Sequence, residues 1–210
     1  MRMLLRLAGT TIAALVVAVT AVGAASAGTA RQGQPAGTAA PVVLRGGRTV
    51  VTTAPGIAAA LLGSGIVPIT TLPGTEGVLV TKAGPLVRLG FPVTGGRVSL
   101  NPLSGRILHR GGILFLDVKT GKQIMVSDFT INLGSRVLTA IVNGNPHARV
   151  PVFRLGLAHA TLRVHRHWVT ARGIAARVTK VAASALDATF HTTLFKPGML
   201  IGTAGTTLHI

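Results

Sequence analysis

Residues 106–143 read RILHRGGILFLDVKTGKQIMVSDFTINLGSRVLTAIVN, and this stretch decides the fold class. Short runs of aliphatic and β-branched residues alternate with turn sequences, of which KTGK and NLGS are the clearest. Runs of this length, closed by Gly, Asn and Ser, are typical of antiparallel strands joined by tight turns. Within QIMVSDFTI the apolar parity changes near Ser127 and Asp128, which predicts a β-bulge. The stretch therefore predicts a curved antiparallel meander.

The flanking segments extend this pattern and add two short helices. PGIAAALLGSG predicts a helix over 57–62 that ends at the Gly-Ser-Gly sequence. A second, Ala-rich helix is expected over 180–192, with Val181, Leu186 and Phe190 on one face, before a terminal strand. The meander is expected to begin at Gly95, with a strand GRVSL that turns through NPLSG into RILHR. Residues 42–210 are thus predicted to form a single all-β domain, an antiparallel β-sandwich or barrel-like meander with two short peripheral helices.

The N-terminal segment has the three parts of a secretory signal peptide. MRMLLR is basic, residues 7–22 are mostly apolar, and Ala25 and Ala27 precede a cleavage site at Gly28. The alternative is a retained membrane anchor, for which this apolar core is barely long enough. We therefore expect a signal peptide over 1–27, a flexible lead over 28–41, and no transmembrane segment in the mature chain. The chain has no Cys, so no disulfide supports the exported domain.

The chain is strongly basic, with 21 Lys and Arg against four acidic residues. Removal of residues 1–27 also removes Arg2 and Arg6, which leaves a net charge of +15. Such an excess favours anionic partners, either an anionic cell-wall polymer or an acidic membrane surface. The alternative is a solvated surface that only keeps the protein soluble, because the charges are spread singly along the strands. Specific nucleic-acid binding is not expected, because stacking aromatic residues are lacking.

Four segments carry a family resemblance: FPVTGGRVSLNPLSGRILHRGGILF, VSDFTINLGSRVLTAIVNG, RVPVFRLGLAHA and AASALDATFHTTLFKPGMLIGTA. Their order resembles exported proteins of high-GC Gram-positive bacteria, and the HtaA domain of secreted haem-uptake proteins. The resemblance covers roughly Gly47 to the C-terminus. It implies a β-sandwich with small helices and, in HtaA domains, ligation of haem iron by tyrosine. This chain has no Tyr, so that route to haem is excluded.

Few residues have the spacing that catalysis or metal binding requires. His109, beside Gly111 and Gly112, is the one candidate haem ligand, and we interpret it instead as a hydrogen-bonded residue that supports the turn. His165 and His167 are either half of a metal site or, as we favour, the tip of a hairpin between ATLRV and WVTARGIAARV. The scarcity of acidic residues leaves little for acid–base chemistry or a triad. We therefore predict no enzymatic activity, no metal site and no cofactor.

The sequence supports two functional hypotheses. The preferred one is a non-enzymatic exported module, secreted and associated with the anionic cell envelope. Its expected polyanion-binding residues break the apolar alternation of two paired strands: Arg154, Arg163, Arg172 and Arg177. The alternative is an extracellular carrier of haem or a small apolar ligand, held by His109 or by the hydrophobic interior. An enzyme is the least favoured class.

Overall fold

The computed structural model describes residues 40–210, which lie within one compact unit, Thr38–Ile210. The predicted signal peptide over 1–27, and the predicted lead up to residue 39, lie outside the described residues.

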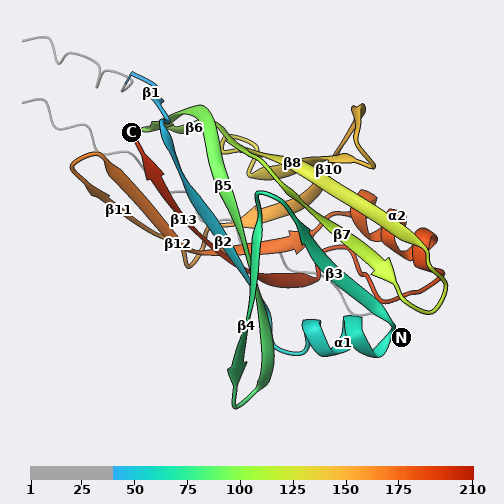
Figure 1. Ribbon diagram of the computed structural model, residues 1–210. Helices are drawn as coiled ribbons and strands as arrows, with labels where there is room; N and C mark the ends of the chain where they lie inside the picture. The colour runs from blue at the N-terminus through green and yellow to red at the C-terminus, as the bar shows by residue number, and fades with distance from the viewer. Residues whose placement is uncertain (1–39) are drawn as a thin grey trace, which may run out of the picture. The chain divides into compact units, whose positions relative to one another are not determined.

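Eight antiparallel strands close into a barrel, in which each strand pairs with two barrel neighbours (Figure 1). In spatial order around the barrel they are β5 (Gly84–Leu100), β2 (Gly46–Thr53), β13 (Leu200–His209), β12 (Trp168–Val178), β10 (Asn145–Gly156), β9 (Val137–Val142), β8 (Gln123–Asn132) and β6 (Leu103–His109). The strand β6 completes the ring because it pairs with β5 along one edge and with β8 along the other. The all-β prediction is confirmed, in its barrel form.

Five further strands and two helices are attached to this barrel. The short strand β1 (Val42–Val43) and the strand β4 (Thr75–Thr81) pair with β5. The strand β7 (Gly112–Asp117) joins β3 (Ile66–Thr71) to β8, and β11 (Thr161–His165) pairs with β12. The helices are α1 (Ile57–Gly63) and α2 (Lys180–Phe190), close to the predicted bounds. Among residues 40–210, neither helix is long and apolar enough to cross a bilayer.

The helix α2 is oriented differently from the prediction. Thr179 is its N-cap residue, and the Thr179 hydroxyl accepts a hydrogen bond from the backbone N–H of Ala182 at 3.1 Å. Its buried face includes Ala182 and Phe190, and Leu186 packs against the same core. These positions are four residues apart and so share one side of a helix. Val181 is exposed, so the prediction that it shares this face was wrong.

Two irregularities shape the barrel strands. The predicted bulge is confirmed: Asp128 has a positive φ of 51°, and the β8–β9 register shifts between Ser127 and Thr130. The expected strand start at Gly95 is wrong, because β5 runs without interruption from Gly84 to Leu100 and Gly95 marks only a register shift.

Two glycines set how closely β5 and β6 approach. A Cβ on Gly96 would collide with the carbonyl oxygen of Arg106. A Cβ on Gly105 would collide with the carbonyl oxygen of Arg97 on the opposite strand. Both glycines have positive φ, a conformation that side chains other than glycine rarely adopt. The barrel closure by β6 therefore depends on glycine at these positions.

Candidate ligand-binding cavity

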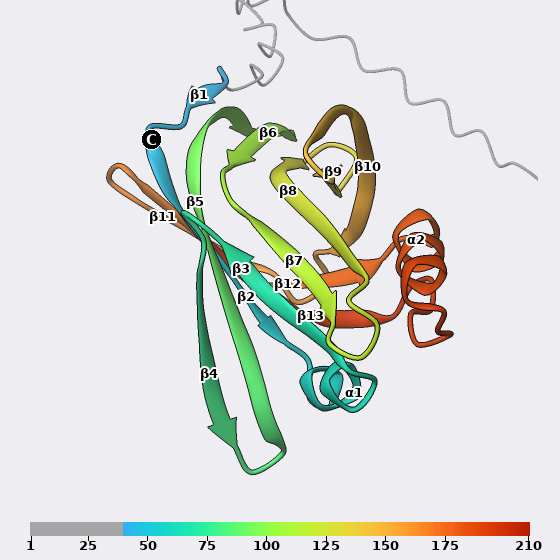
Figure 2. The same cartoon turned by 45° about the vertical axis from the view of Figure 1, so that its right-hand side comes forward.

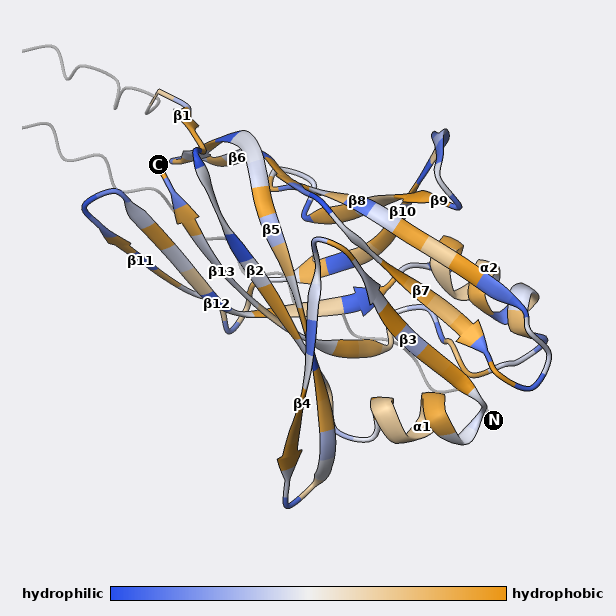
Figure 3. Cartoon of the chain, viewed as in Figure 1, coloured by the Kyte–Doolittle hydropathy of each residue, from blue (hydrophilic) through white to orange (hydrophobic). Residues whose placement is uncertain are grey.

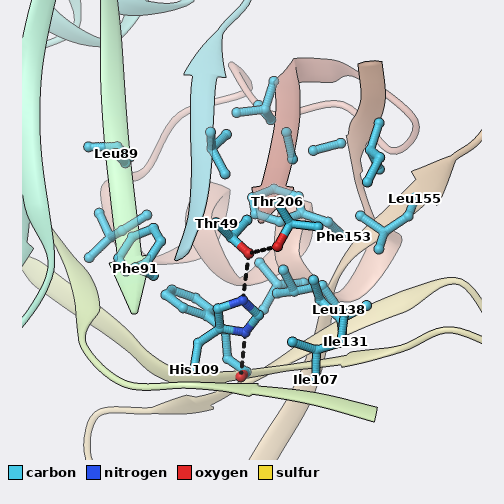
Figure 4. A pocket seen from close by; sticks show the side chains of 18 of the residues that line it. Thr49, Leu89, Phe91, Ile107, His109, Ile131, Leu138, Phe153, Leu155 and Thr206 are labelled. Carbon is cyan, nitrogen blue, oxygen red and sulfur yellow. Dashed lines mark hydrogen bonds between the residues drawn. The ribbon is translucent and has the colours of Figure 1, made fainter. Parts of the chain in front are cut away.

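The interior of the barrel contains a cavity of about 360 Å³. All eight barrel strands contribute inward-facing side chains to its wall, and Figure 4 shows several of them around the space. The lining is almost entirely aliphatic and aromatic. Its polar side chains are Thr49, Thr53, Thr161, Thr206 and His109. This volume lies within the range of small-molecule sites, which are concave and mostly apolar with a few polar groups.

The two ends of the cavity wall differ. At one end Ile57 and Leu61 of α1, together with Ala182 and Leu186 of α2, contribute to the lining, so both helices help to close the barrel. The lining also includes Leu103 at the start of β6 and Leu162 on β11, which are exposed to solvent. Leu162 is 51% exposed, so the apolar wall extends outward to the protein surface there.

His109 lies at the end of β6 and is 5% exposed. Its Nε2 lies 2.8 Å from the hydroxyl of Thr49 on β2, and its Nδ1 lies 3.3 Å from the carbonyl oxygen of Phe129 on β8. The Thr49 hydroxyl is in turn 2.8 Å from the hydroxyl of Thr206 on β13. Figure 4 shows this chain of hydrogen bonds crossing the barrel. His109 therefore links strands that are far apart in the sequence.

Burial fixes the protonation state of this histidine. It lowers the pKa of His109 from 6.5 to about 4, although the hydrogen bond to Phe129 acts in the opposite direction. The ring is thus neutral at pH 7. Because a carbonyl only accepts, Nδ1–H donates to Phe129, and Nε2 must accept from the Thr49 hydroxyl. Thr206 then donates to Thr49. Both ring nitrogens are engaged within the protein.

The interpretation of His109 as a hydrogen-bonded residue is therefore confirmed, with one difference. Its partners come from β2 and β8 rather than from the Gly111–Gly112 turn. Thr49 and Thr206 were missed by sequence reasoning, since 157 residues separate them along the chain and no local pattern joins them.

The four predicted polyanion-binding arginines lie on the neighbouring strands β10, β11 and β12 and are here called the arginine face: Arg154, Arg163, Arg172 and Arg177. Arg154 of β10 lies directly opposite Arg177 of β12. Across the β11–β12 hairpin, Arg172 pairs with Thr161 and Arg163 with Thr170. Arg154 and Arg177 each lie between two residues that line the cavity, which places these two side chains on the outside of the barrel. All four are exposed, and only Arg177 has a described hydrogen bond, to the carbonyl oxygen of Gly198 at 3.0 Å.

The acidic residues of the described chain are engaged elsewhere. The carboxylate of Asp117 accepts from the backbone N–H of Lys119 and from the hydroxyl of Thr120, and the Thr120 bond is the main reason that the pKa of Asp117 is lowered. The carboxylate of Glu76 accepts from the backbone N–H of Thr70, that of Asp128 lies 3.5 Å from the hydroxyl of Ser127, and that of Asp187 accepts from the backbone N–H of Phe195. These contacts stabilise turns and loops and leave the arginine face without a described acidic partner.

His165 and His167 lie at the tip of the β11–β12 hairpin, as predicted. His165 pairs with Trp168 across a two-residue turn that contains His167. Sequence reasoning missed His209 of β13, which stacks on Trp168 with ring centroids 4.8 Å apart. His167 lies edge-on to the His209 ring at 6.5 Å. Within residues 40–210, no group of three or more His, Cys, Asp or Glu residues is placed to bind a metal ion.

Comparison with known proteins identifies the fold. No protein-family profile matches the sequence, and no curated protein matches it. Among solved structures, the C-terminal domain of HtaA from Corynebacterium glutamicum superimposes with a TM-score of 0.52 at 13% identity, over 78% of this chain and 98% of that domain. The chain has an HtaA-like fold. A domain-swapped dimeric variant of the same domain gives a TM-score of 0.49 at 16% identity, over 72% of this chain and 88% of that one.

The sequence resemblance to HtaA is thus confirmed at the level of the fold. The haem ligation that HtaA domains imply does not fit the residues of this HtaA-like barrel. The chain has no tyrosine, and the Nε2 atom of the cavity histidine already accepts a hydrogen bond from Thr49.

Proposed function

We propose that this chain is an exported, non-enzymatic binding protein that holds a small apolar molecule inside its barrel. The cavity of about 360 Å³ is the observation that carries this proposal. The sequence alone favoured envelope binding over ligand carriage. Well-packed protein interiors hold few voids larger than a water molecule. A cavity of this size inside the barrel therefore favours ligand carriage over envelope binding as the main function.

The polarity of the lining defines the class of ligand. The cavity wall has no charged side chain, and its buried His109 is neutral and satisfied by protein partners. A charged group placed there would lose its hydration without a compensating partner. We therefore propose a ligand whose buried part is hydrocarbon, and not a haem whose iron is coordinated by this chain.

This proposal is tested with a neutral apolar fluorophore, 1-N-phenylnaphthylamine, titrated into the full chain. Ala176 is buried and lines the cavity, so Ala176→Phe fills part of the space. Ala188→Phe, on the exposed side of α2, is the matched control. We expect Ala176→Phe to weaken binding by roughly tenfold or more, since it removes apolar contact area from the ligand.

A second cavity-lining variant, Ala171→Phe, should weaken binding in the same way, which separates loss of cavity space from a folding defect at Ala176. Circular dichroism tests whether all three variants are folded. Equal affinity in the cavity-filled and control proteins would place the fluorophore outside the barrel and contradict the proposal.

A second function is favoured by the arginine face. Arg154 and Arg177 oppose each other across neighbouring strands, where like charges repel. A bound polyanion relieves this repulsion, and its own counterions are released. We propose that this surface retains the protein on an anionic polymer of the cell envelope, outside the cell.

Retention on purified cell-wall polymer tests this second function. Changing Arg154, Arg163 and Arg172 together to Gln should weaken retention at low salt. A control with the same loss of charge changes three exposed residues away from the arginine face, Arg45, Arg97 and Lys122, to Gln. Molar salt should release the wild-type protein, because the Debye length falls from about 10 Å at 0.1 M to about 3 Å at 1 M. Equal effects of the two triple variants would attribute retention to net charge alone.

A further inference from the structure

The β4–β5 hairpin carries apolar side chains that nothing in the described chain covers. Val78 and Val80 of β4 are 67% and 81% exposed, and Leu79 between them is also exposed. Figures 1 and 2 show this hairpin projecting beyond the barrel, and Figure 3 shows the apolar colour of β4. Scattered exposed apolar residues are ordinary, but a contiguous exposed group on a projecting element indicates an interaction site.

The apolar residues occupy both faces of the hairpin. Val78 and Val80 are paired with Val87 and Pro85 on β5, whereas Leu79 is paired with Leu86. Successive residues of a strand point to opposite faces, so Leu79 and Leu86 lie on the other side of the hairpin from the valines. A protein partner that packs on one face, or adds a strand at the edge, leaves the second face exposed. A lipid phase covers both faces together.

Cationic side chains lie where the hairpin joins the barrel. Arg88 pairs with Gly77 at the base of the hairpin, and Arg48 of β2 donates a hydrogen bond to the Thr75 hydroxyl. Together they line a shallow surface pocket of about 300 Å³, with Leu79 and Glu76 at its edge. Glu76 is already satisfied, because its carboxylate accepts from the backbone N–H and the hydroxyl of Thr70 at 3.0 and 2.6 Å.

The distance between the apolar end of the hairpin and the cationic residues at its base matches the distance between the acyl chains and the phosphates of a membrane surface. Arg88 lies three residues along β5 from Pro85, the partner of Val80, which corresponds to about 10 Å at about 3.3 Å per residue. Apolar faces of surface-bound elements enter the headgroup–acyl boundary by about 5–10 Å. Arg88 would thus be level with the lipid phosphates when Val80 reaches the acyl chains, with Leu79 and Val78 at intermediate depth. Lys82, in the hairpin turn, has an aliphatic stem long enough for its ammonium group to reach back to the headgroups.

We propose that the β4–β5 hairpin inserts into the surface of an anionic lipid bilayer. Val78, Leu79 and Val80 enter the acyl-chain boundary, while Arg48 and Arg88 contact the lipid phosphates. This surface is separate from the cavity and from the arginine face. Its test therefore succeeds or fails independently of both proposed functions.

The absence of Cys from the chain allows a single label to report on this insertion. Val80→Cys in the full chain carries an environment-sensitive fluorophore, and Val181→Cys on α2, a position 48% exposed and outside the arginine face, carries it as the control. We expect vesicles of phosphatidylglycerol to shift the emission of the Val80 label to shorter wavelength, and vesicles of phosphatidylcholine to shift it far less. The Val181 label should not respond. The apolar N-terminal segment is common to both proteins and cannot produce this difference.

A second experiment tests the side chains themselves, with the label placed at Ala83→Cys in the turn. The double change Val78→Thr and Val80→Thr retains the β-branched shape and should weaken partitioning into phosphatidylglycerol vesicles by roughly tenfold. The same change at the exposed residues Val42 and Val164 should leave partitioning unaltered. A shift of the Val181 label instead of the Val80 label would overturn the proposal. So would a shift that grows with protein concentration without vesicles, since a second copy would then cover the hairpin.

Discussion

Acidification should destabilise this protein through His109, whose described hydrogen bonds are to neutral groups only. The folded pKa of about 4 lies below the ordinary value of 6.5, so between these values the unfolded chain binds a proton that the folded chain does not. Stability is therefore fully present above pH 6.5 and falls as the pH drops toward 4. At about 1.4 kcal/mol per pH unit, the total loss is about 3 kcal/mol. That is a large share of the total stability of a typical domain, which is roughly 5–15 kcal/mol.

The measurement is urea unfolding of the wild type and of His109→Gln at several pH values between 7 and 4. Gln retains a donor for the Phe129 carbonyl and an acceptor for the Thr49 hydroxyl, but it does not titrate. The wild type should lose about 3 kcal/mol relative to the variant across this range. Asp117, whose folded pKa lies below 3.8, acts at lower pH and in both proteins alike. Parallel pH profiles for the two proteins would refute a buried, neutral His109.

Three further predictions concern the closure of the barrel, haem and export. Gly96→Ala should destabilise the fold by about 2 kcal/mol or more, because the added Cβ would collide with the Arg106 carbonyl oxygen in a backbone region of positive φ. Gly77→Ala is the control, because a Cβ there meets open space, and it should leave the thermal melting temperature nearly unchanged. Added haem should give no specific, stoichiometric Soret shift, and a shift that disappears in His109→Ala would show coordination by this chain. Mass spectrometry of protein from the culture medium should find an N-terminus near Gly28, whereas an intact Met1 would contradict cleavage.

Local sequence patterns predicted the local features well. The Gly-Ser-Gly end of α1, the bulge at Asp128 and the β11–β12 hairpin each depend on contacts within a few residues, so parity and turn residues were sufficient. The arginine face was predicted from the same alternation, and its binding of a polyanion stays a prediction. The orientation of α2 was mispredicted at Val181, because an Ala-rich helix offers a weak apolar stripe and the barrel selects which side it packs against.

Features that depend on distant pairing could not be predicted in this way. No local pattern indicates that β6 pairs with both β5 and β8, or that Thr206 reaches Thr49 across the barrel. The break expected at Gly95 was wrong for the same reason. In sequence, a glycine that ends a strand is identical to one that permits close approach of another strand, and only the position of Arg106 opposite Gly96 shows that the Gly95-Gly96 pair lies within a strand. The cavity is a property of the closed ring and appears in no single strand.

The order in which the strands pair has a consequence for how the chain folds. The strand β13, the last along the chain, lies between β2, which begins at Gly46, and β12, so the ring cannot close until residues 200–209 are available. Loop closure over such a separation is slow compared with hairpin formation. An incompletely emerged chain is therefore held open as a set of unjoined hairpins. If the predicted leader directs export, we expect this late closure to leave the barrel unfinished until the whole domain has crossed the membrane.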